Sequence, residues 1–102
     1  MTKTDDGTAL DIQREENESK GRYTTTLDGH EAELTYSRAG ESMIIIDHTG
    51  VPDALRGRGV GEALVERAVK DARNEKRSIL PLCPFAKAMI ARRPEWQDVL
   101  KA

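Results

Sequence analysis

The sequence has one cysteine, no long apolar run and no excess of basic charge, and each of these shortages excludes a class of protein. Because Cys83 is the single cysteine, the chain cannot form an internal disulfide bond. No apolar run approaches the roughly 20 residues that a membrane-spanning helix needs. The formal net charge is −2, so no global positive field attracts nucleic acid. Residues 1–11 lack the apolar core of a secretory signal. We therefore expect a cytoplasmic protein that binds neither membrane nor nucleic acid.

The length of 102 residues indicates one domain with a modest hydrophobic core. Hydrophobic residues make up 37% and charged residues 33%, a balance typical of a globular protein with a well-charged surface. Few apolar side chains occur in the first ten residues. We therefore expect a disordered tail at 1–10 and a folded domain at 11–102. We also expect the protein to be a monomer.

The first half of the chain predicts antiparallel strands. Apolar and polar residues alternate at 23–27 and again at 32–36, the period-2 pattern of half-buried strands. Asp28-Gly29, between these segments, is a hairpin signal. A second turn at 39–41 is followed by the continuous apolar run 43–46, as expected of a strand covered on both faces. The pattern indicates a meander that ends in a central strand.

The second half changes to helical spacing. Apolar residues recur on one helix face from Val60 to Ala72, and Asn74 is the expected left-handed stop. A short strand is expected at 79–82, parallel to the strand at 43–46 because a helix connects the two. The next helix begins at Pro84, and its expected apolar face consists of Phe85, Met89 and Ile90. These elements predict an α+β fold: a mostly antiparallel sheet with one parallel β–α–β unit.

The most informative stretch, Arg56-Gly57-Arg58-Gly59-Val60-Gly61, lies between the apolar strand and the long helix. Its glycines allow a tight turn and a close backbone approach to a ligand. The helix that follows directs free N–H groups at the turn, which predicts an anion site, most often for a phosphate. A Walker A loop would need Lys and Ser or Thr at Glu62-Ala63, and the third glycine of a dinucleotide motif would fall on Glu62 or Leu64. Both nucleotide motifs are therefore excluded, and a purely structural turn stays as the alternative.

Three motifs in this order resemble the Gcn5-related N-acetyltransferases. The glycine stretch, between a strand and a helix, is similar to the acyl-CoA signature of that family. Together with Leu80-Pro81-Leu82-Cys83-Pro84-Phe85 and Arg93-Pro94-Glu95-Trp96, it resembles the very small single-domain subfamily, over about residues 20 to 100. The resemblance implies a GNAT-like fold, acetyl-CoA as cosubstrate, no metal, and transfer of the acetyl group to an amine.

The resemblance also implies which residues hold acetyl-CoA. Backbone N–H groups of residues 56–61 would hold the pyrophosphate, aided by the helix dipole and by the charges of Arg56 and Arg58. The strand around Thr49–Val51 would pair with the pantetheine arm, where family members splay the two parallel strands. Pro81 suits a place where strand pairing is interrupted, since it donates no hydrogen bond. A backbone N–H near the strand end would polarise the thioester carbonyl. The expected cofactor-binding residues are Thr49, Val51, Arg56, Gly57, Arg58, Gly59, Val60, Gly61, Pro84 and Phe85.

Cys83 and His48 are the candidate catalytic residues. Cys83 precedes Pro84 at the start of a predicted helix, whose positive end lowers the pKa of a thiol. The resemblance implies a reactive cysteine at the thioester, whereas a buried small hydrophobic residue is the alternative. A histidine can gain or lose a proton near neutral pH, so His48, near the end of the central strand, is a candidate for orienting the amine or relaying a proton. A structural role is the alternative.

Three residues depart from the pattern of the resembled subfamily. Gly50 stands where an acidic residue is common, Met89 where a tyrosine is common, and Arg93 where a histidine is usual. Larger relatives often use the tyrosine to protonate the leaving thiolate. They also carry an insertion that walls the acceptor pocket, and residues 17–21 leave no room for one here. The CoA site is therefore better supported than the proton-transfer groups, and the acceptor side is expected to be open.

These observations predict an acetyl-CoA-dependent N-acetyltransferase. Its activity is expected to be low if the proton-transfer groups are incomplete. Its acceptor is an unidentified primary amine of a small molecule, peptide or protein. Two alternatives stay open: a CoA-binding or acyl-CoA-sensing module with little catalysis, and a protein-interaction domain on the same scaffold.

Overall fold

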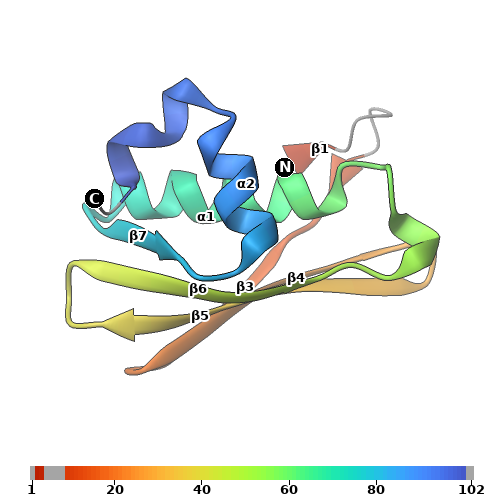
Figure 1. The fold of residues 1–102 in the computed structure, drawn as a ribbon. Helices are drawn as coiled ribbons and strands as arrows, with labels where there is room; N and C mark the ends of the chain where they lie inside the picture. The colour runs from red at the N-terminus through yellow and green to blue at the C-terminus, as the bar shows by residue number, and fades with distance from the viewer. Residues whose placement is uncertain (1, 4–8, 101–102) are drawn as a thin grey trace.

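A long helix crosses one face of a five-stranded sheet (Figure 1). The computed structural model describes residues 2–3 and 9–100. The strands are β1 (Thr2–Lys3), β2 (Ala9–Leu10), β3 (Gln13–Glu16), β4 (Lys20–Leu27), β5 (His30–Ala39), β6 (Met43–Gly50) and β7 (Ser78–Pro81). The helices are α1 (Val60–Asn74) and α2 (Pro84–Ala91), with 3₁₀ turns η1 (Asp53–Leu55) and η2 (Pro94–Val99). β1 and β2 pair with each other, and the main sheet has the order β3-β4-β5-β6-β7. The α+β prediction is confirmed.

Strands β4 to β6 form the predicted antiparallel meander, and β3, which the sequence patterns did not indicate, adds a further antiparallel strand beside β4. Asp28 and Gly29, which join β4 to β5, both have positive φ angles, 51° and 80°. Between β3 and β4, Oδ1 of Asn17 accepts hydrogen bonds from the backbone N–H groups of Ser19 (2.9 Å) and Lys20 (2.8 Å). Local side-chain acceptors of this kind stabilise tight turns. The connection is therefore short, with no helical insertion between these strands.

The sheet ends in a parallel pair that separates part of the way along β6. Strand β7 pairs with β6 from Met43↔Ser78 to Ile46↔Pro81, and α1 makes the crossover between them. Beyond this point the Ile46 carbonyl accepts hydrogen bonds from both Leu82 and Cys83 backbone N–H groups, each at 3.1 Å. Within the described residues, the rest of β6 pairs only with β5. Pro81 is therefore the last paired residue of β7, where the sequence predicted interrupted pairing.

A β-bulge coincides with this separation. Thr35 pairs with His48, whereas the next residue, Tyr36, pairs with Ile46, so Asp47 is the extra residue on β6. A bulge bends its strand and increases the local twist. The second half of β6 is thereby turned relative to the first, beside the point where β7 ends.

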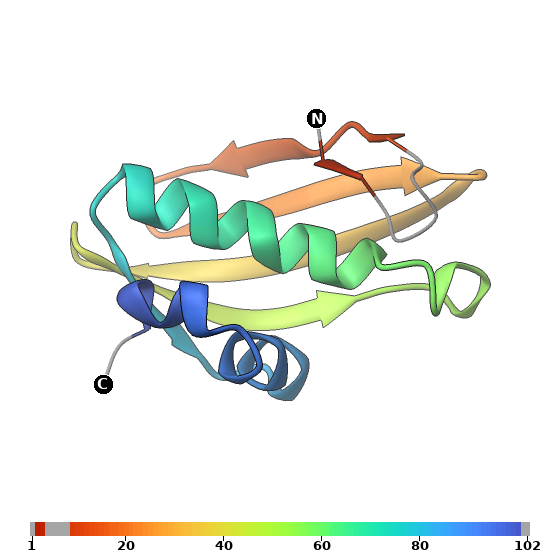
Figure 2. The same ribbon diagram turned by 90° about the horizontal axis from the view of Figure 1, so that it is seen from above.

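The core lies between the sheet and the helices, which all cover one face (Figures 1 and 2). The predicted apolar stripe of α1 is buried, and it comprises Val60, Leu64, Val65, Ala68, Val69 and Ala72. It packs on inward-facing strand residues such as Tyr23, Leu34, Tyr36 and Ile46. Fully burying a Leu or Val side chain contributes about 1.5–3 kcal/mol, so this stripe fixes α1 on the sheet.

Three expectations about local structure differ from the structure. The left-handed residue after α1 is Lys76 (φ 58°), whereas Asn74 is still helical. Leu82 lies outside β7 and is 61% exposed, because the strand stops at Pro81. Phe85 is 38% exposed and is not part of the buried face of α2, which is formed by Ala86 and Ile90.

The expected disordered tail at 1–10 falls largely outside the described residues, since 1 and 4–8 are not described. In the described part, Thr2–Lys3 pairs with Ala9–Leu10, and the Leu10 side chain is buried in the core. Leu10 therefore packs with the domain expected to begin at residue 11. None of the described helices combines the length and the apolar character that crossing a membrane requires.

Candidate functional site

The glycine stretch forms the turn that leads into α1. Gly57 and Gly59 have φ angles of 79° and 78°, in the left-handed region that favours glycine. Leu55, just before the turn, is 1% exposed and anchors it to the core. Gly59 is the N-cap of α1, and its carbonyl accepts the first helical hydrogen bond, from Ala63 N–H (3.0 Å). The N–H groups of the first helical turn have no carbonyl partner within the helix, which is the arrangement that binds anions.

A pocket of about 590 Å³ lies at this turn, between the end of β6, the start of α1 and the start of α2. Its lining includes eight of the ten residues expected to bind the cofactor: Thr49, Val51, Arg56, Gly57, Gly59, Val60, Gly61 and Phe85. It also includes Leu55, Glu62 and Met89, which the sequence reasoning did not assign to binding. Met89 follows Phe85 by four residues on α2, a helical spacing that would have revealed it as a neighbour.

Phe85 forms one wall of the pocket because Gly61 leaves room for its ring. A Cβ atom at Gly61 would lie 2.8 Å from Cζ of Phe85 and 3.2 Å from Cγ2 of Val51. Gly61 has no positive φ angle, so close packing rather than backbone conformation requires glycine here. This contact explains why Phe85 is not in the core: its ring lies on the first turn of α1 and faces the pocket.

Two of the expected cofactor-binding residues are not among those that line the pocket. The Arg58 guanidinium pairs with the Asp28 carboxylate in the β4–β5 turn. Pro84 is the first residue of α2 and serves to start that helix. Arg56, which does line the pocket, donates from Nε to Asp53 at 2.8 Å, and both side chains are largely exposed.

Cys83 is the N-cap residue of α2 and is buried beside β6. Its Sγ lies 3.6 Å from Oγ1 of Thr49, a pocket residue. Burial raises the pKa of the Cys83 thiol, but hydrogen bonds from the Ala86 and Phe85 backbone and from Thr49 outweigh burial. The net pKa is below the ordinary value of a thiol, in the direction that the sequence predicted for this helix end.

The structure does not bring His48 to Cys83. Successive side chains of a strand point to opposite faces of the sheet, so His48 faces away from its neighbour Thr49 and from Cys83. The His48 side chain is exposed, and its Nε2 lies 3.1 Å from the place where a Cβ of Gly50 would be. His48 therefore lies on the sheet face opposite the helices, beside Gly50, which stands where an acidic residue is common in the resembled subfamily.

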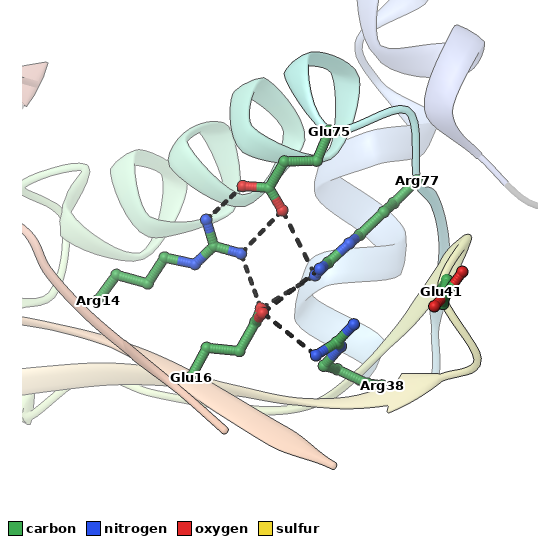
Figure 3. A pocket seen from close by; sticks show the side chains of 6 residues that line it. All are labelled: Arg14, Glu16, Arg38, Glu41, Glu75 and Arg77. Carbon is green, nitrogen blue, oxygen red and sulfur yellow. Dashed lines mark hydrogen bonds and ion pairs between the residues drawn. The ribbon is translucent and has the colours of Figure 1, made fainter. Parts of the chain in front are cut away.

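A second hollow, at the other end of α1, is lined by charged side chains (Figure 3). Glu16 lies at its centre and pairs with Arg14 (2.8 Å), Arg77 (3.0 Å) and Arg38 (3.7 Å). Arg14 also pairs with Glu75 at the end of α1. The ion pairs link β3, β5 and the α1–β7 turn. With Glu41, the lining holds three arginines and three carboxylates, so its formal charges balance.

The geometry places a glycine-lined pocket at the N-terminus of α1 next to a cysteine of lowered pKa, with no cluster of metal-ligating side chains among the described residues. Comparison with known proteins gives consistent results. The family model described as GCN5-related N-acetyl-transferase matches residues 22–99. A solution NMR structure of a GCN5-like candidate N-acetyltransferase from Staphylococcus aureus is similar, with a TM-score of 0.66 and 36% identity over 88% of each chain.

Curated relatives match a shorter segment. Protein NATD1 of Gallus gallus is 38% identical over 60 residues, which is 57% of this chain and 54% of the relative. Protein NATD1 of Homo sapiens is 37% identical over 60 residues, or 57% of this chain and 53% of the relative. The matched segment thus spans about half the length of these curated relatives.

Proposed function

Because this chain belongs to the GCN5-related N-acetyltransferase family, we propose that it is an acetyl-CoA-dependent transferase that acetylates a primary amine. The observation that carries the proposal is the pocket between the end of β6, where only β5 pairs with the strand, and the first turn of α1. Its lining joins a glycine turn, suited to an anion, to an apolar wall made of Val51, Phe85 and Met89. That combination suits a long ligand with a charged end and an apolar arm.

The residues present fit the parts of acetyl-CoA. Gly57 and Gly59 allow the backbone of the turn to come close to a pyrophosphate, and the N–H groups of α1 supply hydrogen-bond donors. The free side of the chain at Thr49 to Val51, which comprises the end of β6 and the residue after it, offers backbone groups to the amide-containing arm, in the manner of an added strand. When bound, acetyl-CoA supplies an activated acetyl group as a thioester.

Cys83 is the group that we propose for proton or acyl transfer. Its Sγ carries an acidic proton near Thr49, at the pocket end where β6 and β7 separate. When the amine attacks the acetyl carbon and the carbon–sulfur bond of the thioester breaks, this proton would pass to the leaving CoA thiolate. The Thr49 hydroxyl and the α2 backbone N–H groups would then stabilise the thiolate left on Cys83. His48, on the opposite sheet face, is proposed to orient the incoming amine, with which it would share that face.

The acceptor, the location and the assembly state belong to the same proposal. The short β3–β4 turn supports an acceptor side that is open to an exposed amine of a small molecule, peptide or protein. The single cysteine and the acidic balance, with a pI near 5.7, are consistent with a cytoplasmic monomer.

A second candidate function is CoA binding with little turnover. Met89 lines the pocket where a tyrosine is common in the resembled subfamily, and its thioether has no proton to give to a leaving thiolate. In that case the pocket residues would bind the ligand and Cys83 would serve only as packing.

A titration with acetyl-CoA, followed by backbone amide chemical shifts, tests the binding step. We expect shifts concentrated at Val51 to Leu64, because these residues form the turn and the start of α1. The same samples are then assayed for acetyl transfer to a panel of primary amines. No response of this segment at millimolar ligand would contradict both functions, whereas shifts without transfer to any amine would favour the second.

A further inference from the structure

Glu62 brings a negative charge to the wall of a pocket proposed to hold an anion. It lies in the first turn of α1 and is one of the residues that line the pocket. A carboxylate at this end of a helix is favourable by itself, because it interacts with the positive end of the helix dipole. The same position directs its charge against a phosphate bound at that helix end. Glu62 therefore needs a neutralising partner if the pocket is to bind an anion well.

The other charged residue of the lining does not supply that balance. Arg56 is paired with Asp53 at 2.8 Å, so this pair contributes about as much negative as positive charge. With Arg56 offset by Asp53, an uncompensated Glu62 would leave the pocket wall net negative.

Arg93 provides the missing charge from a distant part of the chain. Its guanidinium forms an ion pair with the Glu62 carboxylate, and its second terminal nitrogen lies 4.0 Å from the carboxylate of Glu95, a largely exposed residue that solvent screens more strongly. The Arg93 side chain also lies over the ring of Trp96, at 5.0 Å from the centroid, and Trp96 is buried. The Arg93 backbone carbonyl accepts hydrogen bonds from Trp96 N–H (3.0 Å) and from Nε2 of Gln97 (3.1 Å). The 3₁₀ turn η2 thus holds Arg93 in place beside the first turn of α1.

We propose that Arg93 is a positioning residue that masks the charge of Glu62, so that the first turn of α1 accepts the phosphates of CoA. The inference rests on the proposed function, and it assigns to η2 a part in ligand binding without contact to the ligand. Arginine stays charged at every physiological pH, so the masking of the Glu62 charge does not depend on pH. A histidine at this position would make the masking pH-dependent.

Four variants measured by calorimetric titration with CoA test the proposal. Arg93→Gln keeps a polar but shorter side chain and removes the charge, and we expect CoA affinity to fall about tenfold. The double variant Glu62→Gln/Arg93→Gln removes both charges, and its affinity should return to within about twofold of the wild type. Arg93→Lys should retain the wild-type affinity because it keeps the charge. Arg92→Gln, an exposed neighbour, is the matched control and should leave affinity unchanged.

Two further readouts separate charge masking from a structural effect. The loss in Arg93→Gln should shrink as salt is raised, because salt screens partly exposed charges. Pantetheine, which lacks phosphate, should shift the pocket amides equally in wild type and Arg93→Gln. Thermal unfolding of each variant shows whether it is folded.

The proposal is overturned if Arg93→Gln binds CoA as tightly as the wild type. It is also overturned if the double variant stays as weak as Arg93→Gln, since Arg93 would then contact the ligand directly or only support the fold. Failure of the wild type to bind CoA would instead overturn the proposed function, so the two failures are distinguishable.

Discussion

Cys83 combines burial with a thiol pKa below its ordinary value, and this combination gives a prediction at the scale of one residue. If its Sγ transfers a proton or the acetyl group, Cys83→Ala should lower turnover at least about tenfold, which corresponds to about 1.4 kcal/mol of transition-state stabilisation. CoA affinity should change little, because Cys83 is not among the residues that line the pocket. Steady-state kinetics with the best amine of the panel, together with a CoA titration, measure both quantities.

The size-matched variant Cys83→Ser controls for the small cavity that alanine leaves. It should be nearly as inactive as Cys83→Ala, because a serine hydroxyl is a far weaker acid than this thiol. Full turnover in either variant would mean that Cys83 takes no part in catalysis and only packs beside Thr49.

At the scale of elements, the contact between α1 and α2 depends on Gly61. Alanine in a helix is favoured over glycine by about 1 kcal/mol, but its Cβ would lie 2.8 Å from the Phe85 ring. Because Phe85 is partly exposed, its ring has room to swing away. We therefore expect Gly61→Ala to change the free energy of unfolding by less than about 1 kcal/mol while weakening CoA binding severalfold.

Urea unfolding and CoA titration of the same protein separate these two effects. The companion Gly61→Ala/Phe85→Leu tests the cause, since a smaller side chain should accommodate the added methyl group and recover part of the affinity. If Gly61→Ala binds CoA like the wild type, the Phe85 ring is not a wall that the ligand contacts.

For the whole molecule, the charged cluster of Figure 3 makes stability depend on pH. Burial raises the pKa of Glu16, but hydrogen bonds from Arg77, Tyr36 and Arg14 outweigh it and lower the pKa from 4.5 to about 2. A lowered folded-state pKa stabilises the protein above the unfolded-state pKa, and this stabilisation is lost as pH falls through the folded-state value. Glu16→Gln should therefore cost about 1 kcal/mol at neutral pH, a figure reduced for solvent screening.

The difference between the wild type and Glu16→Gln should shrink as pH falls from about 4.5 to about 2, as followed by urea unfolding across that range. Glu41→Gln is the matched control, since Glu41 lines the same hollow but is joined to none of the side chains drawn with it (Figure 3). A pH-independent difference between wild type and Glu16→Gln would mean that the cluster acts through shape rather than charge.

The parts of the fold that sequence reasoning predicted correctly depend on local patterns. The alternation at 32–36 and the helical spacing from Val60 to Ala72 reflect which side of one element is buried, so they can be read without knowing the neighbours. The glycine turn was equally local, because positive φ angles at Gly57 and Gly59 require glycine.

The remaining features depend on contacts between distant residues. The ring of Phe85 leaves the core because Gly61, on another helix, makes a place for it. The partner of Glu62 is Arg93, which follows β7 and α2 in the sequence and is therefore distant from Glu62 along the chain. A charge or an aromatic ring can be read from a sequence, but which of several possible partners it meets is decided by the packing of the whole chain.

The end of β6 beyond Ile46 has an open edge on the side away from β5, and this edge also bears on self-association. A strand edge with free backbone groups is a template for a strand of another chain, so the feature that opens the pocket also exposes the protein to aggregation. Asp47 and His48, both exposed on this segment, place polar groups where a foreign strand would dock. A ligand that pairs with β6 would occupy the same backbone groups, and the loaded protein should be the more resistant to such association.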